Sequence, residues 1–445
     1  MFGTGEMLIL VAVLLGLVFA GVHIAVALGF AAMLGIYMMV GDFQVVASFV
    51  GSTAYEAVRD YVFAVIPLFM LMGEFLAKCG AASDLFSLFN RLTRIVPGRL
   101  AIATVISNAV FAFVTGVSIA AAAAFSRIAY PEMKRHGYQD RFALGCIAGS
   151  ACLGMLIPPS VLMIVWGILT EMSIGDLFLA GVPPGFLLTG FYMLYILVAA
   201  ALRPALVGEG SVAARAMKEV PQIPLVRALA STLLVIALVA GTLGGIWLGA
   251  FTPTEGAGVG AAAALLLAMG KGLRAKEIGQ VILSVGRTSA PLLLLLVTAQ
   301  LYSRVLTMTG FTRAAQDLLL GSGLGQGGVL LLMVLVWFVL GCLIDSISIM
   351  ILTVPIFFPI AKAIGIEPLA FAIMGIVAIE TGLLTPPFGL LVFTVKAAIQ
   401  DPKIGVGTIF AGSTPYWFAL LAVIVCLWQF PQIATYLPDL LKAQP

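Results

Sequence analysis

Long apolar segments recur along this chain from end to end, and they constrain its fold more than any other feature. Many of them run for about 17–25 residues, the length that an α-helix needs to cross a bilayer core of about 30 Å. Of the 445 residues, 62% are hydrophobic and only 10% are charged, whereas about a quarter of a soluble protein is charged. The sequence therefore predicts an all-α polytopic membrane protein. It excludes a soluble enzyme, a nucleic-acid-binding protein and a secreted disulfide-bonded scaffold.

Hydropathy predicts about ten membrane crossings with an external N-terminus. No Lys or Arg precedes the first apolar segment, so we expect that segment to be a retained first helix rather than a cleaved signal peptide. The crossings are expected near residues 6–20, 22–41, 62–79, 142–172, 181–203, 228–249, 254–270, 288–308, 369–398 and 407–430.

A further apolar stretch at residues 100–126 has basic residues on both flanks. Because cytoplasmic loops are enriched in Lys and Arg, a segment between two basic flanks should enter and leave on the same side. Gly116 allows a turn, and the hydroxyls of Thr115 and Ser118 can satisfy exposed backbone groups. The pattern predicts a re-entrant hairpin over residues 100–130 with its tip at residues 115–118.

A second such stretch, residues 328–361, has a weak helical centre at residues 341–346 and sparsely charged flanks. We expect it to form a re-entrant hairpin that enters from the opposite face. A pair of full crossings in place of each hairpin remains open. With the two hairpins, all but five of the 23 Lys and Arg residues lie inside, and the five outside are Arg59, Arg304, Arg313, Lys362 and Lys442.

The two halves of the chain resemble each other at an offset of 228 residues. The offset superposes several prolines and glycines, which punctuate backbone geometry. An odd number of crossings in each half would turn the second copy upside down, as in the inverted repeats of secondary transporters. We expect a first inverted repeat at residues 1–203, a cytoplasmic linker at 204–227 and a second inverted repeat at 228–445. The matched residues include Ser118 with Ser346, Pro131 with Pro359, Gly137 with Gly365, Gly154 with Gly382, and Pro158-Pro159 with Pro386-Pro387.

Each half also contains a helix broken by two consecutive prolines, expected at residues 142–172 and 369–398. Two prolines remove two backbone donors, so carbonyls around Gly154 and Gly382 should lose helical partners. Free carbonyls suit a cavity in which a cation takes their lone pairs, and hard oxygen donors suit Na⁺. The alternative is that each break is a kink satisfied by neighbouring Ser or Thr.

Charge inside the predicted membrane segments is scarce, which makes Asp345 and Glu380 notable. Asp345, at the second hairpin tip, is the stronger candidate for a cation site, together with Gly341, Gly382 and Thr385. Its alternative role is to cap the second helix of the hairpin. No catalytic or ATP-binding motif occurs, so an ion gradient is the expected energy source.

These motifs resemble the large membrane subunit of tripartite ATP-independent periplasmic (TRAP) transporters along essentially the whole chain. The resemblance implies an elevator-type importer in a bacterial inner membrane, driven by Na⁺. It also implies two partners, a separate small four-helix membrane subunit and a periplasmic substrate-binding protein, and a cargo of C4-dicarboxylate, sialic acid or a related carboxylate. The motifs are TGVS at residues 115–118, YPEM at 130–133, GMLIPPS at 154–160, Asp345-Ser346, and ETGLLTPPFG at 380–389.

The resemblance also implies two Na⁺ sites, built mostly from backbone carbonyls. Substrate contacts are expected from the hairpin tips, where helix N-termini favour anions. The first Na⁺ site would use Thr115, Ser118, Gly154, Ile157 and Pro159; the second Gly341, Gly382, Thr385 and Phe388, with Asp345 close by; the substrate contacts are Ser118, Ser346 and Ser348.

Three other functions are compatible with parts of this pattern. A stand-alone Na⁺-coupled elevator anion symporter would share the repeats and hairpins but need no binding protein. A channel would more often build a symmetric pore from identical subunits. A membrane enzyme would need a catalytic constellation that the sequence does not contain.

Overall fold

A computed structural model of the chain describes residues 4–208 and 225–442, and within those residues the protein is built from helices. The β-type pairing among them is an isolated bridge between Tyr138 and Val207. The middle of the predicted linker, residues 209–224, lies outside the described residues. Its two ends are a short 3₁₀ helix, Pro204–Leu206, and the start of the next long helix at Leu225.

Seven helices of the described residues are long and apolar enough to cross a membrane. They include Ser346–Ala363, which the sequence assigns to the second hairpin. The predicted crossing at 254–270 forms a helix but is not among the seven, because Gly, Thr and Glu lower its mean hydropathy. The prediction of an all-α polytopic membrane protein is confirmed. The exact number of crossings and the side that each hairpin enters from stay predictions.

Helices with similar bounds recur at the 228-residue offset. The first half contains α1 (Thr4–Phe19), α2 (Ile24–Val40), α3 (Phe43–Arg59), α4 (Val65–Lys78), α5 (Ala81–Leu92), α6 (Arg99–Thr115), α7 (Ser118–Arg135), α8 (Asp140–Ala151), α9 (Leu153–Leu156), α10 (Val161–Thr170) and α11 (Ile174–Leu202). The second contains α13 (Leu225–Trp247), α14 (Pro253–Gly270), α15 (Ala275–Thr309), α16 (Phe311–Gly321), α17 (Gly325–Gly341), α18 (Ser346–Ala363), α19 (Pro368–Gly382), α20 (Leu390–Ile399) and α21 (Val406–Gln429), followed by α22 (Gln432–Lys442). The exceptions are that α15 covers the stretch of α3 and α4, and α19 that of α8 and α9.

The correspondence between the halves extends to unusual backbone conformations. Gly137 and Gly365, which follow α7 and α18, both have a φ of 78°. Glu171 and Gln400 end α10 and α20, and they are the non-glycine residues with positive φ in the described part of the chain. A left-handed conformation is uncommon outside glycine. Here it ends two corresponding helices, one residue away from the 228-residue offset. Inversion of the second copy in the membrane stays a prediction.

Four helices were not expected from hydropathy. They are α3, α5, α16 and α22, and α5 and α22 in particular carry apolar residues on one side and polar residues on the other. Averaging over a window cancels such a pattern, so an amphipathic helix gives a weak hydropathy signal. Helix α15 begins at Ala275, well before the predicted crossing at 288–308. A hydrogen bond from Arg274 N–H to the Glu277 side chain caps its first turn.

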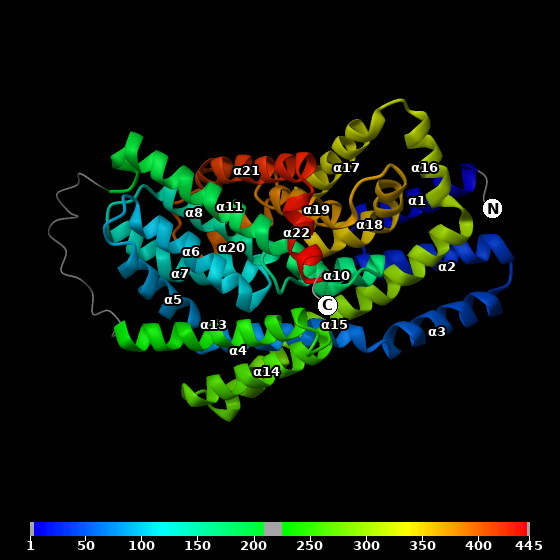
Figure 1. The fold of residues 1–445 in the computed structure, drawn as a ribbon. Coiled ribbons are helices and arrows are strands. Elements are labelled where there is room, and N and C mark those ends of the chain that lie inside the picture. The colour runs from blue at the N-terminus through cyan, green and yellow to red at the C-terminus, as the bar shows by residue number, and fades with distance from the viewer. Residues whose placement is uncertain (1–3, 209–224, 443–445) are drawn as a thin grey trace.

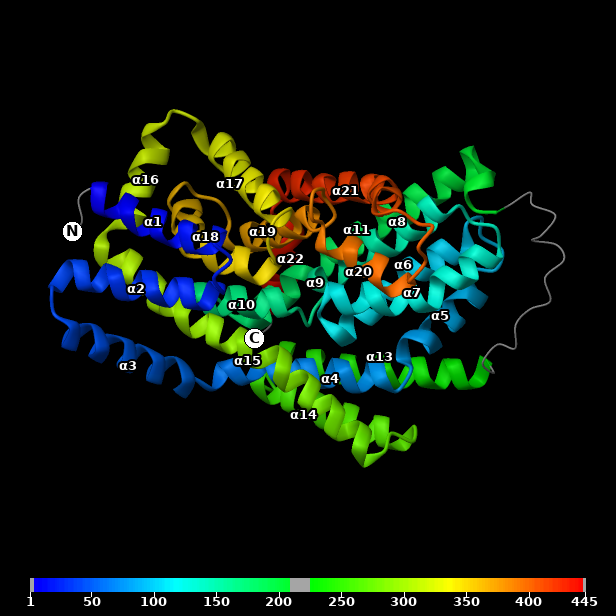
Figure 2. The same cartoon turned by 180° about the vertical axis from the view of Figure 1, so that it is seen from behind.

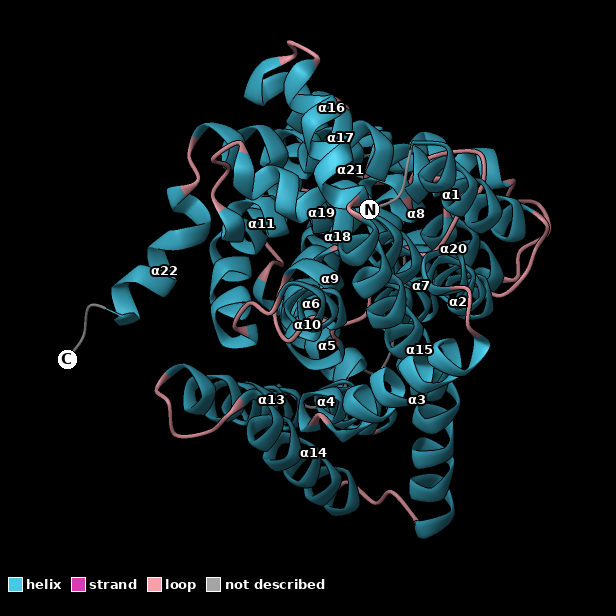
Figure 3. Cartoon of the chain, turned by 90° about the vertical axis from the view of Figure 1, so that its right-hand side faces the viewer, coloured by secondary structure: helices cyan, strands magenta, loops and turns pink. Residues whose placement is uncertain are grey.

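The helices form two layers that lie side by side along the length of the molecule. Figure 1 shows α3, α4, α13 and α14 below, with α15 running along them, and the hairpins and broken helices above. The reverse view keeps the same division (Figure 2), and the end-on view shows α22 projecting away from the upper layer (Figure 3). The upper layer contains α6 to α11 and α17 to α21, and so it holds both hairpins and both broken helices (Figure 1).

Glycines let helices of the upper layer approach closely. A Cβ atom on Gly145 of α8 would lie 2.1 Å from the backbone of Gly412 in α21, and one on Gly149 would lie 2.2 Å from the Tyr416 ring. Small residues at such crossings increase van der Waals contact between membrane helices. This packing fixes the first broken helix against the second half of the chain.

Candidate functional site

The first hairpin tip lies against the first helix break. Helix α6 ends at Thr115 and α7 begins at Ser118, with Gly116 between them at a φ of 60°. A Cβ atom on Gly116 would lie 2.2 Å from the carbonyl oxygen of Pro159, so only glycine fits between tip and break. Val161 N–H then donates to the Gly116 carbonyl at 3.3 Å, which joins α10 to the tip.

The second tip meets the second break in a similar way. A Cβ atom on Gly341 would lie 2.7 Å from the Cα of Gly382, so these two glycines let α17 and α19 touch. Phe388 N–H donates to the Cys342 carbonyl at 3.3 Å, which joins the segment after the two prolines to the tip. The structure thus places each predicted hairpin tip next to the predicted break of the same half.

Both breaks interrupt the helices where the sequence predicts, but several of the carbonyls have partners. Ser160 Oγ donates to the Met155 carbonyl at 2.5 Å, and Thr385 N–H donates to the Gly382 carbonyl at 2.9 Å. Neighbouring hydroxyl and amide groups therefore satisfy part of each break, as the alternative kink interpretation expects. A carbonyl oxygen has a second lone pair, so these bonds leave capacity for a cation. The peptide bonds Pro158-Pro159 and Pro386-Pro387 are both cis.

Glu380 lies between the two hairpin tips. The residue is only 1% exposed. Ser118 Oγ donates to Glu380 Oε2 at 2.6 Å, and Ser346 Oγ donates to Glu380 Oε1 at 3.3 Å. The sequence interpretation ranked Asp345 above Glu380, and it missed that Glu380 contacts both tips. Its position two residues before Gly382 in a buried helix was the available signal.

Asp345 occupies a different environment, because it is exposed at the start of α18. Asp345 Oδ1 accepts from Ser348 N–H at 3.0 Å, and Oδ2 accepts from the Ser348 hydroxyl. This is the helix-capping geometry that the sequence offered as the alternative role of Asp345. A second role of Asp345 at a cation site stays a prediction.

The three predicted substrate contacts share one feature. The hydroxyls of Ser118 and Ser346 donate to Glu380, and that of Ser348 donates to Asp345. A hydroxyl has one proton to donate and two lone pairs. In this arrangement the three hydroxyls have no proton left to donate to a ligand. A bound carboxylate accepts hydrogen bonds, so it would need backbone N–H groups as donors instead.

A cavity of about 150 Å³ brings both tips together with the acidic residues. Most of its wall is apolar, from α4, α15 and the two broken helices. Of the predicted site residues, Ser118, Ser346 and Asp345 line it. Gly154, Pro159, Gly341 and Gly382 lie in the contacts between tips and breaks, and Thr115 lies beside Gly73 of α4. Its lining includes Met70, Val117, Ser118, Ile119, Met155, Val161, Thr288, Leu292, Asp345, Ser346, Ile347, Glu380, Leu383 and Leu390.

The two breaks differ in exposure. Every residue from 151 to 160 is buried, including Ile157 and Pro159. In the second break Thr385 is half-buried, and Phe388 is 60% exposed. The second predicted Na⁺ site is therefore open to the surroundings of the chain, and the first is enclosed.

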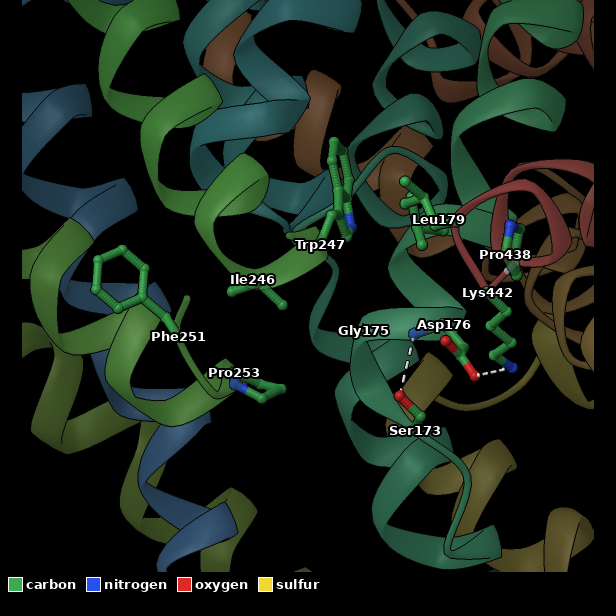
Figure 4. Close-up of a pocket in the computed structure, with 11 residues that line it drawn as sticks. Ser173, Gly175, Asp176, Leu179, Ile246, Trp247, Phe251, Pro253, Pro438 and Lys442 are labelled. Atoms are coloured by element: carbon green, nitrogen blue, oxygen red, sulfur yellow. Dashed lines mark hydrogen bonds and ion pairs between the residues drawn. The ribbon is translucent and has the colours of Figure 1, made fainter. Parts of the chain in front are cut away.

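A second cavity, of about 220 Å³, lies away from the tips and breaks. Figure 4 shows it between the start of α11, the end of α13 and α22, with Trp247 and Phe251 among its lining residues. Lys442 Nζ pairs with Asp176 Oδ2 at 2.7 Å, which ties α22 to α11. None of the predicted site residues lines this cavity.

The architecture is that of a multi-pass helical membrane protein. The solved structure of the YdaH transporter of Alcanivorax borkumensis is similar to this chain with a TM-score of 0.61, covering 87% of this chain and 88% of that chain at 18% identity. At that identity the likeness shows the fold.

Sequence comparison shows the family. A family model described as "Tripartite ATP-independent periplasmic transporter, DctM component" matches residues 11–433. The chain is 33% identical to the C4-dicarboxylate TRAP transporter large permease protein DctM of Pseudomonas aeruginosa, over 86% of this chain and 88% of that protein. It is 28% identical to the ectoine permease TeaC of Halomonas elongata, over 97% and 99% of the two chains. The chain therefore belongs to the DctM family and is a large permease subunit of a TRAP transporter, not an enzyme.

Proposed function

We propose that the chain is the large subunit of a Na⁺-coupled importer of an organic acid, working by an elevator mechanism in a bacterial inner membrane. A periplasmic substrate-binding protein would deliver the substrate, and a separate small four-helix membrane subunit would complete the membrane part. The observation that carries the proposal is that two hairpin tips meet two helix breaks at matching positions of two repeated halves.

The residues at the breaks fit Na⁺ as the coupling ion. Their polar groups are carbonyl and hydroxyl oxygens, the hard donors that such an ion prefers. Thr385 Oγ1 donates its proton to the Thr381 carbonyl at 2.9 Å, so its lone pairs are free for a cation. Thr115 Oγ1 has the same arrangement in the first half, donating to the Phe111 carbonyl at 3.2 Å.

The two-layer fold supports the elevator part of the proposal. The tips and breaks lie in the upper layer, while α3, α13 and α14 lie in the lower one (Figure 1). The cavity is lined from both sides, because Met70 belongs to α4 and Thr288 and Leu292 belong to α15. Movement of the upper layer against the lower one would carry the tips and breaks together across the membrane. Coupling ions bound at both breaks would favour the conformation in which the tips are closed.

The substrate class rests on the relatives. The names of these relatives include a C4-dicarboxylate, sialic acid and ectoine. All three carry a carboxylate, and a carboxylate suits the N-termini of α7 and α18 at the cavity. We propose a small carboxylate as the substrate, bound mainly through backbone N–H groups of the tips.

The test is uptake of labelled organic acids by proteoliposomes that contain this chain and the small subunit. The variables are an inward Na⁺ gradient and the cognate binding protein. Uptake that requires both supports the proposal. Na⁺-driven uptake by the chain alone would assign it to self-sufficient carriers, and uptake indifferent to the Na⁺ gradient would contradict the role given to the breaks.

A further inference from the structure

We propose that Glu380 is a positioning residue that joins the two hairpin tips through Ser118 and Ser346, so that the tips open and close together. The cavity between the tips is the proposed substrate site. That the coupled tips open and close around a substrate rests on the proposed function. The contact itself does not depend on that function.

The bridge formed by Ser118, Glu380 and Ser346 takes one hydroxyl donor from each half of the chain. Ser118 and Ser346 are the first residues of α7 and α18, and they match at the repeat offset. Each donates to a different oxygen of the same carboxylate, at 2.6 Å and 3.3 Å. Hydrogen bonds to a charged acceptor are stronger than bonds between neutral groups. A change at one tip is therefore transmitted to the carboxylate that holds the other.

One carboxylate serves both tips because the repeat is not symmetric at this position. The residue that matches Glu380 in the first half is Cys152, whose Sγ lies 3.9 Å from the Glu380 carbonyl oxygen. Two carboxylates at these adjacent positions would repel each other in a buried setting. Replacing one of them by cysteine leaves a single acceptor between two hydroxyl donors.

The surroundings of Glu380 favour a buried side chain that holds the two tips together. The residue is 1% exposed, and the positive ends of α7 and α18 face it through Ser118 and Ser346. A helix N-terminus stabilises a nearby negative charge, and here two converge. The side chain also lines the cavity, so a ligand that enters between the tips contacts the bridge.

The test is hydrogen–deuterium exchange of the full chain in lipid nanodiscs, read separately at residues 342–347 and 115–118. Ser118→Ala should accelerate exchange at the opposite tip, residues 342–347, by about tenfold. Ser346→Ala should do the same at residues 115–118. An effect confined to the tip that carries the substitution would overturn the proposal.

Two further variants separate the bridge from general damage. Ser126→Ala removes a buried hydroxyl from α7 that has no hydrogen-bond partner, so it should leave both tips unchanged. Glu380→Gln keeps the length and one acceptor, so it should disturb the tips less than Glu380→Leu. Equal disturbance by these two substitutions would contradict the bridge.

A third comparison keeps this inference separate from the proposed function. The single variant Ser118→Ala and the double variant Ser118→Ala/Ser346→Ala should accelerate exchange at both tips to the same extent, because the bridge acts as one unit. A double variant whose effect is the sum of the two single effects would contradict the proposal. Failure of the wild type to use a Na⁺ gradient would overturn the proposed function but leave the exchange result standing.

Discussion

The hydroxyl of Ser118 lies 2.6 Å from Glu380 Oε2, although the two residues are 262 positions apart in the chain. One is the first residue of a hairpin helix in the first half, and the other lies in the last turn of α19 in the second half. Their contact places the two halves of the candidate site against each other.

Asp345 has an observed role as the cap of α18 and a predicted role at the cation site, and substitution can separate them. Asp345→Asn should keep the cap of α18, because asparagine also accepts from Ser348 N–H, and the unfolding temperature should stay close to that of the wild type. Loss of the charge should raise the Na⁺ concentration for half-maximal uptake severalfold. Asp345→Ala should also lose about 1 kcal/mol of stability. An unchanged Na⁺ response in Asp345→Asn would assign the residue to capping alone.

Gly116 provides a test of the contact between the first tip and the first break. Gly116→Ala adds a Cβ atom 2.2 Å from the Pro159 carbonyl oxygen, so tip and break must separate. Gly41→Ala is the matched control, since Gly41 has a similar φ of 71° but nothing within 4 Å of the added Cβ. We expect uptake to fall at least tenfold in Gly116→Ala and to change little in Gly41→Ala, measured at equal amounts of folded protein. Similar uptake in the two variants would contradict a functional contact.

A partly buried charge cluster joins α5, α13 and α14. Lys271 Nζ pairs with Asp84 Oδ2 at 2.7 Å, and Ser231 Oγ donates to the same oxygen at 2.5 Å. Asp84→Ala leaves the Lys271 charge without its partner, and we expect a loss of about 2–3 kcal/mol of stability. The side chain of Lys271 is 23% exposed, which keeps the loss below that of a fully buried pair.

The control for this cluster is an exposed pair on α7. Glu132 and Arg135 form a salt bridge of 3.0 Å with side chains 28% and 48% exposed. Glu132→Ala should therefore cost at most about 1 kcal/mol. Thermal unfolding of the detergent-solubilised variants measures both effects, and an equal cost for the two pairs would refute the special importance of the cluster.

The ion pair between Lys134 and Asp401 predicts a pH dependence at the ends of α7 and α20. The hydrogen bond from Lys134 lowers the pKa of the Asp401 carboxyl, and the same bond raises the pKa of the Lys134 ammonium. The stability from a lowered carboxyl pKa is present above about pH 4 and is lost as the pH falls through the lowered value. The stability from the raised ammonium pKa is present below about pH 10 and is lost as the pH rises further.

The corresponding variant is Asp401→Asn, which still accepts from Lys403 N–H. The difference in unfolding temperature between wild type and Asp401→Asn should be constant between about pH 5 and pH 9 and should shrink below about pH 4. A difference that grows on acidification would contradict the assigned pair.

The tips and breaks could be predicted from the sequence because their signals are local. Gly116 marks a turn, and Pro158-Pro159 and Pro386-Pro387 interrupt helices whatever surrounds them. The amphipathic helices α5 and α22 could not be predicted by hydropathy, since their apolar and polar faces average out. The role of Glu380 as a partner of both tips depends on contacts between distant segments, which no local pattern contains.

The central claim is that the two helix breaks hold Na⁺, and direct binding of radioactive Na⁺ to the purified chain tests it most directly. The wild type should bind Na⁺ saturably, with K⁺ unable to compete. Thr385→Ala should weaken binding at least tenfold. Thr394→Ala should not, although Thr394 Oγ1 makes a matching bond to a helix carbonyl at 2.9 Å. Absence of saturable binding in the wild type, or equal binding by the two variants, would contradict the account.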